Sequence, residues 1–86
     1  MKNTSQKIVS FGIVNKDVMT DPELSLQAKG LYAILTTYAN KERECFPSIN
    51  TLADVANKSC TQISTYIKEL KDKKYLVRKG RIMILK

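Results

Sequence analysis

Two stretches of the chain repeat apolar residues at the spacing of an α-helix. In the first, four residues occupy positions i, i+3, i+4 and i+7 on one helical face, namely Leu31, Ile34, Leu35 and Tyr38. Ser25 is a favoured N-cap residue, so the pattern predicts a core helix over residues 25–40. Tyr32 and Tyr38 are expected to pack rather than to bind a ligand. Gly30 inside this helix predicts the close approach of another helix, because glycine otherwise costs about 1 kcal/mol there.

The second stretch places four more residues on one face, namely Ile63, Tyr66, Ile67 and Leu70. Ser59 and Gln62 form the sequence signature of a capping box at its start. A shorter helix is predicted before it, starting at the cap Ser48 and directing four residues inward, namely Ile49, Leu52, Ala53 and Ala56. Asn57 tolerates a left-handed backbone and should end this helix in a sharp turn.

Short β-prone runs accompany these helices. Residues 44–46, "ECF", can form a short strand, and residues 75–78 and 81–85 read as two strands joined by Lys79-Gly80. A glycine in a two-residue connection indicates a tight hairpin. Residues 8–14, "IVSFGIV", are apolar and β-branched, so they predict either a strand or an arm laid over the core.

In chain order these elements read helix, short strand, helix, tight turn, helix, hairpin. This is the layout of a winged helix-turn-helix, a mainly α fold with a small β-hairpin (α+β), built from three core helices plus the wing. We expect one such domain over residues 15–86, after an N-terminal arm or strand over residues 1–14. A chain of 86 residues suffices for a single core.

The net charge of +7 is confined to the last third of the chain. Residues 1–57 hold six basic and six acidic side chains, whereas residues 58–86 hold nine basic and two acidic ones, which accounts for the whole imbalance. A charge run can be no more than a solvated surface. A neutral segment over residues 1–57 followed by a basic segment over residues 58–86 instead favours a polyanionic partner.

The third helix, residues 59–73, is the predicted recognition helix, because the second helix of a helix-turn-helix enters the major groove with its N-terminal residues at base edges. Four short polar side chains are candidates for reading bases: Thr61, Gln62, Ser64 and Thr65. Candidates for holding phosphates, from the helix N-terminus to the basic wing (residues 75–86), are Lys58, Ser59, Lys68, Lys71, Arg78, Lys79 and Arg81. The implied partner is double-stranded DNA.

Other classes of function find little support in the sequence. The chain has no histidine and two cysteines, Cys45 and Cys60, which cannot make a zinc site. It lacks a phosphate-binding glycine loop and an obvious pair of carboxylates, so we expect neither an enzyme nor a cofactor nor a small-molecule substrate. Without a membrane-spanning run or a signal peptide, it is expected to be cytoplasmic with free thiols. RNA binding is disfavoured because no exposed aromatic platform is evident.

The sequence resembles the helix-turn-helix domains at the N-terminus of plasmid replication initiators and phage replisome organisers. Three segments carry the resemblance: "LSLQAKGLYAIL" (24–35), "CFPSINTLA" (45–53) and "IKELKDKKYLVR" (67–78). The resemblance implies sequence-specific binding to duplex DNA during replication initiation of a plasmid or phage. This chain departs from the family at Lys74, where a glycine is usual.

Two other functions remain open from the residues themselves. The domain could be a small transcriptional regulator, such as a repressor of a mobile element, or a winged-helix module for protein–protein contacts. A homodimer is possible, because a single helix reads too few base pairs for high specificity. The arm over residues 8–14 is the candidate contact between protomers, and packing on its own core is the alternative.

Overall fold

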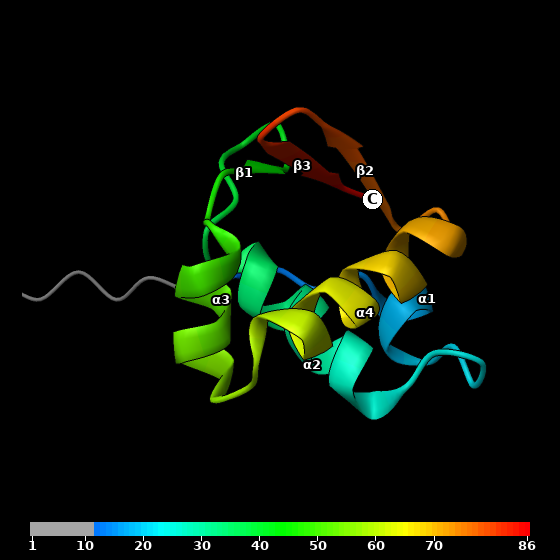
Figure 1. Ribbon diagram of the computed structural model, residues 1–86. Coiled ribbons are helices and arrows are strands. Elements are labelled where there is room, and N and C mark those ends of the chain that lie inside the picture. The colour runs from blue at the N-terminus through cyan, green and yellow to red at the C-terminus, as the bar shows by residue number, and fades with distance from the viewer. Residues whose placement is uncertain (1–11) are drawn as a thin grey trace, which may run out of the picture.

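The computed structural model describes residues 12–86, so the predicted arm lies largely outside the described residues. The elements follow the predicted order, and a single helical turn precedes them, for which Asn15 is the N-cap, as its side chain favours. They are α1 (Lys16–Met19), α2 (Leu26–Thr36), β1 (Glu44–Cys45), α3 (Ile49–Ala56), α4 (Cys60–Asp72), β2 (Leu76–Lys79) and β3 (Ile82–Leu85). The sheet lies over the helices, and α4 leads into β2 (Figure 1). This is the predicted winged helix-turn-helix.

Local hydrogen bonds set where the three longer helices begin. Ser25, Ser48 and Ser59 each accept, at 3.1 Å, the backbone N–H three residues later. At Ser59 the capping box is complete, because the Gln62 side chain accepts the Ser59 N–H. These caps confirm the predicted helix starts.

The core forms where α2, α3, α4 and the sheet meet. Its fully or almost fully buried side chains include Leu31, Tyr32, Leu35, Cys45, Leu52, Ile63, Ile67, Leu70, Leu76, Met83 and Leu85. The predicted inner face of the first long helix is wrong at one position, because Tyr38 is 40% exposed. The helix ends at Thr36, and the hydroxyls of Thr36 and Thr37 donate back to carbonyls within its last turn. Tyr38 therefore lies beyond the helix.

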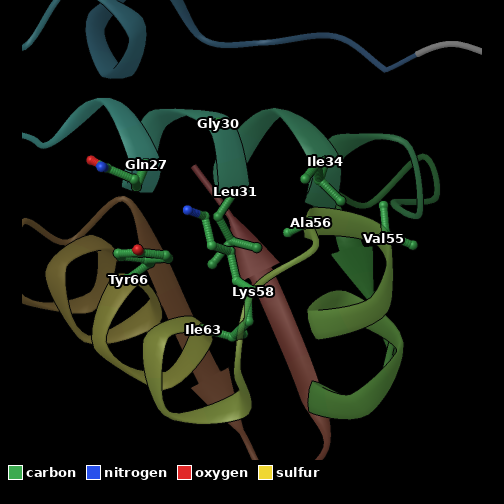
Figure 2. A pocket seen from close by; sticks show the side chains of 9 residues that line it. All are labelled: Gln27, Gly30, Leu31, Ile34, Val55, Ala56, Lys58, Ile63 and Tyr66. Atoms are coloured by element: carbon green, nitrogen blue, oxygen red, sulfur yellow. The ribbon is translucent and has the colours of Figure 1, made fainter.

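Gly30 does not mark a close approach between helices. A Cβ atom placed on it would meet nothing within 4 Å, so the predicted contact is wrong. Gly30 instead borders a hollow of about 330 Å³ between α2 and the helix-turn-helix (Figure 2). The hollow is lined by Gln27, Gly30, Leu31, Ile34, Val55, Ala56, Lys58, Ile63 and Tyr66.

The wing is an antiparallel hairpin, and β1 adds a third strand in the order β1-β3-β2. Its register pairs Lys79 with Ile82, so the turn residues are Gly80 and Arg81. The predicted turn at Lys79-Gly80 is therefore displaced by one residue. A two-residue hairpin turn of type II′ needs a positive φ at its first position, which Gly80 supplies with φ +61°.

Both helices of the helix-turn-helix end in a Schellman motif. After α3, Asn57 takes the left-handed conformation (φ 55°), and the Lys58 N–H donates to Ala53 O. After α4, Lys74 takes the same left-handed conformation (φ 64°), and the Tyr75 N–H donates to Leu70 O. The left-handed position predicted for Asn57 is confirmed. Lys74 occupies a conformation that suits glycine better.

Replacing Lys74 with glycine is expected to stabilise the protein. The left-handed conformation costs a residue with a Cβ about 1–2 kcal/mol, and the greater freedom of glycine in the unfolded chain offsets part of this gain. Lys74→Gly should therefore raise the free energy of unfolding by about 0.5–1 kcal/mol, measured by urea denaturation. Lys74→Ala is the matched control, because it removes the charge and keeps the Cβ. Equal stabilisation by both variants would contradict this account.

Asp21 fastens the loop before α2 to the end of α4. Its carboxylate accepts hydrogen bonds from the Tyr75 hydroxyl (2.7 Å) and the Glu23 N–H (2.9 Å), and it pairs with Lys73 (3.2 Å). The Tyr75 hydroxyl above all, then the Glu23 N–H and Lys73, hold the pKa of Asp21 below its ordinary value. The pKa of Lys73 is raised by its hydrogen bonds to Glu23 and Asp21, and that of Tyr75 by its hydrogen bond to Asp21.

The lowered pKa of Asp21 predicts an acid-sensitive contribution to stability. The folded carboxyl binds its proton less readily than the unfolded one, so its contribution is complete above pH about 4 and is lost as the pH falls further. We expect Asp21→Asn to lower the urea midpoint of unfolding at pH 7. The difference in midpoint between the variant and the wild type should become smaller towards pH about 2.5. A gap that stays constant with pH would exclude this role for Asp21.

Candidate nucleic-acid interface

The outer face of α4 carries all four predicted base-reading residues. Thr61, Gln62, Ser64 and Thr65 are exposed, whereas Ile63, Ile67 and Leu70 of the same helix are buried. Because the two sets lie on different sides of one helix, the polar set faces away from the core. Ser59 and Cys60 begin the helix, and both are exposed.

Gln62 and Thr65 already make hydrogen bonds within their own helix. The Gln62 Oε1 accepts the Ser59 N–H at 3.0 Å and lies 3.3 Å from the Ser59 hydroxyl, which donates to it. A bidentate contact with adenine uses both the amide oxygen and the amide nitrogen, so Gln62 must release Ser59 to make it. The Thr65 hydroxyl donates to Thr61 O at 3.1 Å and can still accept a hydrogen bond.

Acidic neighbours reduce the basic charge of the last third of the chain. Lys68 pairs with Asp72 at 3.1 Å, and Lys73 pairs with Asp21 and Glu23. The Lys68 pair is largely exposed, and such pairs exchange readily with solvent ions. Within residues 12–86, no acidic side chain lies within ion-pair distance of the other predicted phosphate contacts, which are Lys58, Lys71, Arg78, Lys79 and Arg81.

The wing brings one of its cations, Arg78, close to Lys68 and Lys71 of α4. Arg78, Lys79 and Arg81 are all exposed, and the Arg78 Nε donates to Gly80 O at 3.2 Å. A hollow of about 270 Å³ lies between α4 and the wing. Its lining is Ser64, Ile67, Lys68, Lys71, Asp72 and Arg78. Arg78 thus shares one concave surface with residues predicted to contact bases and phosphates.

Lys58 lies apart from this concave surface. Its side chain runs across the hollow between α2 and α4, beside Leu31 and Ile63 (Figure 2). The structure therefore brings Ser64, Lys68, Lys71 and Arg78 together and leaves Lys58 on the other side of α4.

Sequence reasoning missed a group of residues between β1 and α3. A hollow of about 360 Å³ next to the wing is lined by Phe46, Pro47, Ser48, Ile49, Arg78, Arg81 and Met83. The signal in the sequence was the short strand predicted over residues 44–46, which Pro47 and the helix cap Ser48 follow directly. Because successive side chains of a strand alternate between its two faces, burial of Cys45 directs Phe46 outward.

Residues 12–86 contain neither a helix long and apolar enough to span a membrane nor a group of three or more His, Cys, Asp and Glu residues arranged to hold a metal ion.

Comparisons with known proteins agree with the observed fold. Residues 23–76 match the family described as helix-turn-helix domain. A solved structure described as "Structure of MDR initiator" is similar to this chain with a TM-score of 0.67 and 24% sequence identity. The similarity covers 88% of this chain and 75% of the other, and at this identity it establishes a shared fold. A search of curated proteins found no match.

Proposed function

The chain belongs to the helix-turn-helix domain family, and on this basis we propose that it binds double-stranded DNA in a sequence-specific manner. In this proposal α4 enters the major groove, and its N-terminal residues Thr61, Gln62, Ser64 and Thr65 meet base edges. In this proposal the domain acts by binding DNA.

One observation carries the proposal. The concave surface between α4 and the wing holds Ser64, a candidate base-reading residue, beside the cations Lys68, Lys71 and Arg78. The other candidate base-reading residues are exposed on the same helix, nearer its N-terminus. Short hydroxyl and amide side chains suit base edges, whereas lysine and arginine suit the flanking phosphates. A module used only for protein contacts has no need of this separation between uncharged residues at the helix start and cations around them.

We further propose that the DNA is a replication origin of a plasmid or phage. The resemblance of residues 24–35, 45–53 and 67–78 to initiator and replisome-organiser domains supports this role, as does the shared fold with a protein described as an initiator. A transcriptional regulator would use the same surface. Site selection with genomic fragments separates the two roles, because an initiator enriches origin repeats and a regulator enriches promoters.

Fluorescence anisotropy with a random-sequence duplex across a salt series tests DNA binding itself. The five candidate phosphate-binding cations of α4 and the wing are Lys68, Lys71, Arg78, Lys79 and Arg81. At about 0.9 for each contact, they predict a slope of log affinity against log salt of about −4.5. A steep slope supports the phosphate-holding surface. Absent or salt-independent binding at low salt would instead favour a protein–protein module.

The two thiols provide an independent test of the proposed interface. Cys60 is exposed at the first residue of α4, whereas Cys45 is buried, and burial raises its pKa to about 11. Because the thiolate is the reactive form, iodoacetamide should modify Cys60 in the folded protein and Cys45 only after unfolding. Bound duplex should slow the modification of Cys60 several-fold. Unchanged kinetics with saturating duplex would place the DNA elsewhere.

A further inference from the structure

Two aromatic side chains lie exposed near the wing, which corrects the expectation that the chain has no exposed aromatic platform. Phe46 is 57% exposed and Tyr38 is 40% exposed. They line one shallow hollow of about 480 Å³ together with Pro47, Ser48 and Thr51. A partner that covered the two rings would remove their apolar surface from water.

This aromatic surface is continuous with the proposed duplex-binding surface. Arg78 lines both the hollow against α4 and the hollow beside β1, and Phe46 lines both the hollow beside β1 and the one that contains Tyr38. The three hollows therefore form one track, which runs from Lys71 on α4 past Arg78 and Arg81 on the wing to Phe46 and Tyr38. Its α4 and wing portion is cationic and its far end is aromatic.

We propose that the aromatic end of this track holds single-stranded DNA that continues from the duplex bound by α4. Unpaired bases stack on Phe46 and Tyr38, while their phosphates lie against Arg78 and Arg81. This proposal rests on the proposed duplex binding and adds a second class of ligand to it, namely unpaired nucleotides at the edge of the bound duplex.

The chemistry of the track favours single strands over duplex. In a duplex the faces of the bases are stacked on one another, so Phe46 would meet only sugar and phosphate, which offer an apolar ring little. In a single strand the base faces are available, and aromatic side chains stack on them whatever the sequence. Proteins that bind single strands combine such rings with a positively charged groove along the backbone, and Arg78 and Arg81 supply that charge.

The test uses fluorescence anisotropy to compare three kinds of DNA. These are a blunt duplex, the same duplex with a single-stranded overhang of about eight nucleotides at one end, with each end tested in turn, and the single strand alone. The proteins are the wild type, Phe46→Leu and Tyr38→Leu, which keep an apolar side chain without the ring. Leu26→Ala is the matched control, since Leu26 is 80% exposed at the start of α2 and lines none of the three hollows. Thermal unfolding checks that each variant is folded.

An overhang at one end should raise the affinity of the wild type about 5- to 100-fold. Phe46→Leu should lose most of this gain and bind the blunt duplex as the wild type does, and Leu26→Ala should behave like the wild type. An overhang without effect, or an equal loss on blunt and overhung duplex in Phe46→Leu, overturns the proposal. If the protein does not bind the blunt duplex at all, the proposed binding of double-stranded DNA is wrong, independently of the aromatic surface. Binding of the single strand, and its loss in Phe46→Leu, then decides the present proposal.

Discussion

Replacing Arg78 and Arg81 together with glutamine should weaken binding to every duplex by about 2–3 kcal/mol. At each position a hydrogen bond to a charged group, which contributes about 1.5–3 kcal/mol, becomes a neutral one, which contributes about 0.5–1.5 kcal/mol. Both side chains are exposed on the wing, and within residues 12–86 neither has an acidic partner. Glutamine keeps a polar side chain of similar length and removes the charge. The loss should be nearly the same for a selected site and for random DNA, because phosphates carry no sequence.

The salt dependence identifies the cause of this loss. Each phosphate contact contributes about 0.9 to the slope of log affinity against log salt, so the double variant should flatten the slope by about two. The matched control is Lys16→Gln with Lys29→Gln, which removes the same charge from α1 and α2. If the control weakens binding equally, net charge rather than the wing explains the effect.

The second large effect concerns Gln62, whose two possible roles can be separated by substitution. Gln62→Ala removes both the capping box and any contact with adenine. It should lower the free energy of unfolding by about 1 kcal/mol and weaken binding to a selected site by about 1–3 kcal/mol. Binding to random DNA should change little.

Gln62→Glu keeps the cap and removes the base contact. A glutamate at this position still accepts the Ser59 N–H, and its charge suits the helix N-terminus. It cannot donate to adenine, and it repels phosphate. We therefore expect wild-type stability in thermal unfolding, together with a loss at the selected site at least as large as that of Gln62→Ala. Wild-type affinity at the selected site in Gln62→Glu would show that this residue only caps the helix.

The helix starts could be predicted because their causes are local. Ser25, Ser48 and Ser59 each bond to a backbone group three residues away, so the sequence around each cap contains the interaction. The apolar spacing of Ile63, Ile67 and Leu70 likewise fixed which face of α4 is buried.

The hairpin register could not be predicted from the apolar pattern. A turn at Lys79-Gly80 would place Leu76 opposite Met83, whereas the observed turn places it opposite Leu85, and all three are buried. Because the two registers differ by two residues, both leave the same side chains on the core face. The backbone conformation at Gly80 decides between them.

Features that depend on distant segments were also missed. Whether space lies above Gly30 depends on where α3 ends against α2, and the exposure of Phe46 depends on β1 pairing with β3. The pairing of Lys68 with Asp72 is different, because its i, i+4 spacing is visible in the sequence. The concave surface itself requires the wing to fold beside α4, which no local pattern contains.

In the proposed complex with duplex DNA, the short connection between α4 and β2 would make binding sensitive to DNA shape. Only residues 73–75 separate the two elements, and both Lys73 and Tyr75 are fastened to Asp21. These contacts hold the start of the wing against the end of α4. If α4 enters the major groove as proposed, the distance from that groove to the DNA backbone beside the wing is therefore set by the protein. A duplex must bend or twist to match it, so sites with deformable steps such as TA or CA beneath the wing should be preferred even where no side chain touches a base.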